Sequence, residues 1–216
     1  MHEKFYPLDF KPSRERGHYY LLYAEVYKNT VKILLDNLLA QKGYEFQVLK
    51  ERLNDSHGFD HETLPLLFNF RHYVELQLTG LILYGSIISP ELDDGSNKFL
   101  EQARKNHSIT NLFNKCRQFK IHIGNWDKNL IYFILTLDKF DLKSDRFRYP
   151  ENRKGVQFFT SEDTKYIEHK AFYLNLERAS YLHENIIKVI DTLESLETYF
   201  DLAIDDYYES LGYRDE

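Results

Sequence analysis

The sequence has little that would cross-link the chain or insert it into a membrane. Cys116 is the single cysteine among 216 residues, so no internal disulfide can form. No apolar run reaches the roughly 18 residues that a membrane span needs. The N-terminal stretch MHEKFYPLDF also lacks the apolar core of a signal peptide. These absences predict a soluble cytoplasmic protein with no membrane contact.

An excess of basic residues is also missing. Lysine and arginine number 28 against 34 carboxylates, a net charge of −6, which disfavours coating nucleic acid or an anionic membrane through the overall field. Locally, residues 98–122 hold six basic side chains against Glu101, and the stretch from Asp191 onward holds nine carboxylates against one arginine. The basic stretch can contact phosphates and the acidic stretch can complement it in a neighbouring subunit, unless both are solvated helix faces.

Several motifs that carry chemistry are absent. There is no phosphate-cradling glycine loop, no nucleophile elbow and no cysteine-based metal pattern. His57, Asp60 and His61 are residue types that bind metals, but they lie in a loop without further partners, and we interpret them as a surface turn. We therefore expect no metal and no cofactor.

Helical periodicity dominates the sequence. With 43% hydrophobic and 16% aromatic residues, the chain can fill the core of one domain, residues 1–216. After a long first helix, helices are predicted around Arg71, over 96–105, after His107 and over 126–139, with a break at 89–95. The first helix, which Gly43 would end, has an apolar face of Tyr20, Tyr23, Ala24, Tyr27, Val31, Leu34, Leu35 and Leu38. The helix after His107 has an inner face of Ile109, Leu112, Phe113, Cys116 and Phe119.

The last helix carries a 3.5-residue repeat, which is typical of a seam against another helix. Its members are Leu182, Ile186, Val189, Leu193, Leu196, Phe200 and Ala203. The first helix of the same chain is the economical partner, and a second copy of the protein is the alternative. Residues 141–155 read as an irregular loop. The sequence predicts an all-α, up-and-down helical bundle with long first and last helices and a small β-hairpin near 156–172.

Three polar residues interrupt the apolar stretch LFNFRHYVELQLTGLI, residues 67–82. On a helix, Arg71, His72 and Glu75 can meet on one face, because residues three and four apart are neighbours. Buried charges are costly unless paired, so this face is either an internal clamp or part of a site. As a site, this face could carry out acid–base chemistry with Glu75 as base and His72 as acid. As a clamp, it would serve only to neutralise Arg71.

The same stretch carries a resemblance to a family. FRHYVELQLTGLI is similar to the RHxxELxLKxLI helix of the bacterial helical proteins grouped as HEPN-like. NHSITNLFNKC, residues 106–116, resembles their GHxLxxLW-type helix start, and DRFRYPENRKG, residues 145–155, resembles their FRYPxDxxG loop. The order and spacing agree over residues 60–160, with Thr79 standing in place of the family's lysine and Asn106 in place of its glycine.

The resemblance implies a helical bundle, frequently dimeric, from toxin and anti-phage systems in which several relatives cleave RNA. Its expected partners are RNA or a nucleotide, a second copy, and a partner protein encoded in the same operon. The family strings share six residues that we expect to converge, and we predict that Arg148 docks beside Glu75. These residues are Arg71, His72, Glu75, His107, Arg148 and Tyr149.

HEPN ribonucleases place an arginine and a histidine in an R-x4-6-H pattern, often with a polar residue after the arginine. Arg52/His57, Arg117/His122 and Arg178/His183 fit this spacing. We favour Arg117 and His122 because Gln118 follows the arginine. His122 would move a proton and Arg117 would stabilise phosphate charge, with no metal required. The alternatives are a non-catalytic binding module of the same fold, and a purely structural role in assembly.

Overall fold

The computed structural model describes residues 13–40, 63–89, 107–119, 128–140 and 176–210, and within these ranges the chain forms five helices and no strand. The predicted all-α class is therefore confirmed for the described residues. The helices are α1 (Ser13–Ala40), α3 (Thr63–Ile88), α5 (Ile109–Gln118), α6 (Lys128–Phe140) and α8 (Leu176–Ser210).

Most predicted helices are present where the sequence placed them. The first and last helices are the longest, at 28 and 35 residues. α3 ends directly before Ser89, where the break was expected, and α6 begins within two residues of the predicted start. The predicted helix over 96–105, the loop over 141–155 and the hairpin near 156–172 lie outside the described residues and stay predictions.

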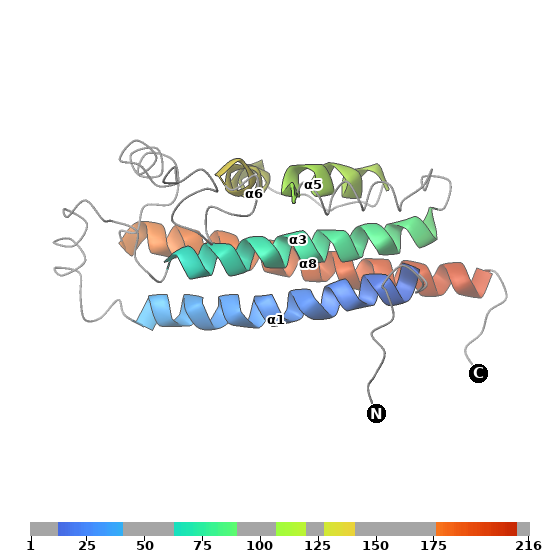
Figure 1. Cartoon of the computed structure of the whole chain (residues 1–216), viewed down its shortest axis with the longest axis horizontal. Helices are drawn as coiled ribbons and strands as arrows, with labels where there is room; N and C mark the ends of the chain where they lie inside the picture. Colours follow the sequence, from blue (N-terminus) through green and yellow to red (C-terminus); the bar gives the residue numbers. More distant parts are fainter. Residues whose placement is uncertain (1–12, 41–62, 90–106, 120–127, 141–175, 211–216) are drawn as a thin grey trace, which may run out of the picture.

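The three long helices pack side by side, and α3 contacts both of the others (Figure 1). α1 runs antiparallel to α3, while α8 runs in the same direction as α3, and α5 and α6 lie on the side of α3 away from α1 (Figure 1). α3 contacts α1, α8 and α5. It can do so because its apolar side chains surround it on nearly all sides, which is the composition of a buried helix.

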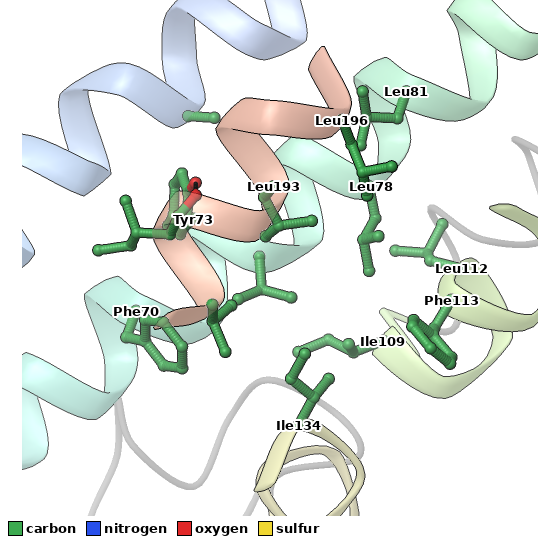
Figure 2. Packing of buried hydrophobic residues seen from close by; sticks show 14 of the residues in the cluster. Phe70, Tyr73, Leu78, Leu81, Ile109, Leu112, Phe113, Ile134, Leu193 and Leu196 are labelled. Atoms are coloured by element: carbon green, nitrogen blue, oxygen red, sulfur yellow. Dashed lines mark hydrogen bonds between the residues drawn. The ribbon is translucent and has the colours of Figure 1, made fainter. Parts of the chain in front are cut away.

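All five helices contribute to one hydrophobic core. Figure 2 shows Phe70 and Leu78 of α3 facing Leu193 of α8, with Ile109 of α5 and Ile134 of α6 closing the same cluster. Such a shared core is what a single domain requires. No helix among the described residues combines the length and apolar character needed to cross a membrane.

Most of the repeat on α8 that the structure describes is buried within the chain. Ile186, Val189, Leu193 and Phe200 are at most 2% exposed. The partner differs from the expected one, since α8 packs chiefly against α3 and makes fewer contacts with α1. The reason is that α3, apolar around its circumference, buries the stripes of both long helices at once.

The buried face of α1 is also rotated from the predicted one. Leu21 and Lys28 join Ala24 at the interface, while Tyr23 is 63% exposed. A close approach of α1 and α3 explains the rotation. A Cβ added to Gly80 would lie 2.7 Å from the Leu21 side chain and 3.2 Å from the carbonyl oxygen of Gly17. A Cβ added to Gly17 would lie 2.6 Å from the ring of Tyr84, so the crossing is closely packed on both helices.

Replacing Gly80 by alanine should therefore destabilise the protein. Alanine favours a helix by up to about 1 kcal/mol over glycine, so the intrinsic effect has the opposite sign. Overpacking at the crossing should outweigh it and lower the free energy of unfolding by about 1–3 kcal/mol, measurable by urea denaturation. Asn114→Ala, at an exposed position on α5, is the control and should not destabilise. A more stable Gly80→Ala protein would contradict the close crossing.

Candidate functional site

A buried arginine forms the centre of the candidate site. The Arg71 side chain is 0% exposed, and its Nη1 donates to Glu75 Oε2 at 2.8 Å. Its Nη2 donates to the backbone carbonyl of His107 and lies 3.6 Å from Asp138 Oδ1. A guanidinium taken out of water is tolerable only when its charge is paired, and two carboxylates and a carbonyl pair its Nη1 and Nη2 atoms here.

Asp138 of α6 caps the first turn of α5. One of its oxygens accepts the Ile109 amide at 2.8 Å, and the other accepts the Thr110 amide at 2.9 Å and the Ser108 hydroxyl at 3.1 Å. Ser108 is itself the N-cap residue, and its hydroxyl accepts the Asn111 amide at 3.2 Å. The amides that a helix start leaves without intrahelical partners are therefore paired, and the carboxylate lies where the helix dipole favours negative charge.

His107 precedes this cap in an uncommon backbone conformation. Its φ of 48° lies in the left-handed region, which side chains other than glycine rarely adopt. The hydrogen bond from Arg71 holds its carbonyl, and its ring nitrogen Nδ1 lies 2.7 Å from Glu75 Oε1. The ring remains accessible, since the His107 side chain is 42% exposed and that of Glu75 is 15% exposed.

These groups make up what we call the junction cluster: Arg71, Glu75, His107, Ser108 and Asp138. It ties α3, α5 and α6 together at one point. It combines one guanidinium and two carboxyl groups with the imidazole of His107. Arg71 and Asp138 are too deeply buried to touch a substrate. His107 is the member that a ligand in solution can reach.

The predicted pairing of Arg71 with Glu75 is confirmed, but the histidine that contacts Glu75 is His107 and not His72. The His72 ring packs against Tyr27 of α1 and Phe68, with centroid separations of 5.2 and 4.4 Å. One residue along a helix turns the side chain by about 100°, so His72 points toward α1 while Arg71 and Glu75 face α5.

Other predicted site residues are placed less fully. Arg148 and Tyr149 lie outside the described residues, so the docking of Arg148 beside Glu75 stays a prediction. Arg117 is exposed near the end of α5, and its proposed partner His122 lies outside the described ranges. So do Arg52/His57 and the HGFDH turn. Thr79, which stands in place of the family's lysine, is buried and donates its hydroxyl to the Glu75 carbonyl at 2.7 Å.

Arg178 lies in α8, where its side chain is not described, and His183 is half-buried on the same helix. The sequence missed Asp138. The sequence does carry a hint of its role, because Asp138 follows the buried residues Ile134 and Leu137 of an apolar helix. A carboxylate at such a position needs a buried partner. No local spacing links it to Arg71 or to the start of α5.

A second polar layer lies between α1, α3 and α8. Lys28 forms ion pairs with Glu25 and Glu194. Burial lowers the pKa of Lys28, but the hydrogen bonds to Glu194 and Glu25 outweigh it, so the pKa is raised. Gln77 donates to Glu197 at 2.5 Å. Burial raises the pKa of Glu197, and the hydrogen bond from Gln77 offsets this only in part.

Replacing Glu197 by glutamine should stabilise the protein at neutral pH. A carboxyl whose pKa is raised by folding favours the folded state when protonated, and this contribution is lost as the pH rises through its folded pKa. The variant should therefore melt at a higher temperature than the parent at pH 7, and the gain should shrink as the pH falls to the ordinary glutamate pKa of 4.5.

Glu184→Gln is the matched control for this prediction. A hydrogen bond from Lys188 lowers the pKa of Glu184, so that substitution should give no stabilisation at pH 7. A Glu197→Gln protein that melts below the parent at pH 7 would contradict the assignment.

Among the described residues, no group of three or more His, Cys, Asp or Glu side chains is arranged to hold a metal ion. Comparisons with protein-family models, curated proteins and solved structures found no match to the chain.

Proposed function

We propose that the chain is a HEPN-like helical protein of a bacterial defence or toxin system, acting on RNA in the cytoplasm as a homodimer and without a metal. One observation supports the proposal most directly. Residues from two of the family strings meet in space, since Arg71 and Glu75 from the first contact His107 from the second. This convergence is what the family resemblance predicts, and it supports the proposal.

The proposed cleavage pair is Arg117 and His122. Arg117 is exposed on α5, so its guanidinium can reach a phosphate in solution. The junction cluster fixes the other end of that helix and would hold α5 in place. Arg117 would stabilise charge on the phosphate in the transition state, and His122 would transfer a proton to or from a ribose or leaving oxygen.

Incubating the purified protein with total RNA and a chelator tests this proposal. We expect cleavage that Arg117→Ala and His122→Ala each abolish, with unchanged circular dichroism and a dimeric mass in solution. Lys188→Ala, an exposed basic residue on α8, is the control and should retain activity. Cleavage that survives both alanine variants would overturn the assignment of the pair, and no cleavage at all would overturn the ribonuclease proposal.

A second candidate is a non-catalytic module of the same fold that binds RNA, a nucleotide or a partner protein from the same operon. The outer face of α1 favours it, because this face exposes Tyr23, Val26 and Ile33, each more than 60% accessible. Apolar side chains gathered on one solvent face are typical of interaction surfaces. This candidate predicts binding without turnover in the same RNA experiment.

A further inference from the structure

We infer that His107 is an acid–base group, with its Nε2 atom presented to substrate and its ring oriented by Glu75. The substrate class, an RNA phosphodiester, rests on the function proposed above. The assignment of this histidine rests on the geometry of the junction cluster alone. His107 is not part of any R-x4-6-H pair.

The contact with Glu75 decides which ring nitrogen is available. A carboxylate oxygen accepts hydrogen bonds, so at 2.7 Å the Nδ1 atom donates to it and carries the proton. The lone pair of the neutral ring is then on Nε2. Within the part of the chain that the structure describes, no group hydrogen-bonds Nε2. A histidine with one nitrogen held by a carboxylate and the other open is the arrangement of a general base.

The contacts around His107 hold its ring and its backbone in place, which is what such a base needs. Glu75 Oε1 accepts a hydrogen bond from the His107 ring. Glu75 Oε2 lies 2.8 Å from Nη1 of Arg71, whose side chain is fully buried. The left-handed backbone of His107 is a strained conformation that persists because Arg71 fixes its carbonyl and Asp138 fixes the next turn. Strain of this kind, held in place by surrounding contacts, clusters at functional positions.

The reaction step is a transesterification. His107 Nε2 takes the proton of a ribose 2′-hydroxyl, and the 2′-oxygen forms a bond to the adjacent phosphorus. The bond from phosphorus to the 5′-oxygen breaks, and that oxygen takes a proton from water. The products are a 2′,3′-cyclic phosphate and a 5′-hydroxyl. The imidazolium then returns its proton to solvent, so atoms and charge balance without any redox partner.

The test uses the full-length protein and three variants. His107→Asn removes proton transfer but suits a left-handed backbone, which asparagine tolerates better than most residues. Glu75→Gln removes the carboxylate that orients the ring. His18→Asn, at an exposed position on α1, is the matched control. Each is assayed for RNA cleavage over a pH series in chelator, and the acylation of each histidine by diethyl pyrocarbonate is followed by mass spectrometry.

We expect His107→Asn to lower the cleavage rate by about 100-fold or more, which is the scale of general acid–base catalysis, while His18→Asn leaves it unchanged. Glu75→Gln should also lower the rate, because it leaves the ring of His107 without the carboxylate that orients it. His107 should be acylated faster than His18 in the parent protein, and more slowly in Glu75→Gln than in the parent.

Cleavage that persists in His107→Asn, but is lost in His122→Ala, would overturn this inference and leave the proposed function standing. If the parent protein cleaves no RNA, both the proposed function and the assignment of RNA as the substrate are overturned. In that case fast, Glu75-dependent acylation of His107 would still support an oriented base, and acylation no faster than that of His18 would overturn it.

Discussion

Replacing Arg71 by methionine is expected to lower the free energy of unfolding by about 3–5 kcal/mol, the cost of removing one partner from a buried ion pair. Methionine fills a similar volume, so the loss does not come from a cavity. It comes from Glu75 and Asp138, which keep their negative charge and lose the guanidinium between them. Chemical denaturation followed by circular dichroism measures the effect.

Two further substitutions sharpen this prediction. Arg71→Lys keeps the charge but cannot reach Glu75, Asp138 and the His107 carbonyl with one planar fork, so its cost should be smaller but clear. Arg117→Met, at the surface of α5, should change stability by no more than about 0.5 kcal/mol. An Arg71→Met protein as stable as that control would mean that the buried charge is not what holds these helices together.

Replacing Asp138 by alanine has the second largest expected effect, a loss of about 2–4 kcal/mol. The carboxylate accepts the amides of Ile109 and Thr110, and each buried amide left unpaired costs about 1–3 kcal/mol. Because the damage begins at the first turn of α5, that helix should open locally. Hydrogen exchange of peptides covering residues 107–119 should be faster than in the parent, while α8 should be little changed.

Asp206→Ala, at an exposed position near the end of α8, is the control for this variant. It removes the same carboxylate from a solvated position and should change neither the stability nor the exchange of α5. Unchanged exchange over residues 107–119 in Asp138→Ala would contradict the capping role, even if the variant were less stable for another reason.

The sequence predicts the helices of this protein well because each is set by local periodicity. The inner face of α5 is an example. Ile109, Leu112, Phe113 and Cys116 were expected inside and are at most 3% exposed. What periodicity cannot supply is the identity of the partner. α8 carries a repeat that fits any long apolar helix, and only the all-round apolar surface of α3 makes it the main partner in place of α1.

The part of the candidate site that lies on a single helix could be predicted from the sequence, and the part that depends on packing between helices could not. Arg71 and Glu75 are four residues apart on one helix, so their pairing follows from helix geometry. Asp138 comes from a different helix, and its contact with α5 depends on the angle at which α6 packs. The rotation of α1 that exposes Tyr23 depends on the approach of Gly17 to Gly80, which no spacing within α1 reveals.

A double-mutant cycle between Arg71→Met and Asp138→Asn tests most directly whether the junction cluster acts as one unit. The two side chains belong to α3 and α6 and meet only through tertiary structure. If they stabilise the same junction, the double variant should be less destabilised than the sum of the single variants, by at least about 1 kcal/mol. Additivity within about 0.5 kcal/mol would show that the two residues act independently, and it would contradict the account.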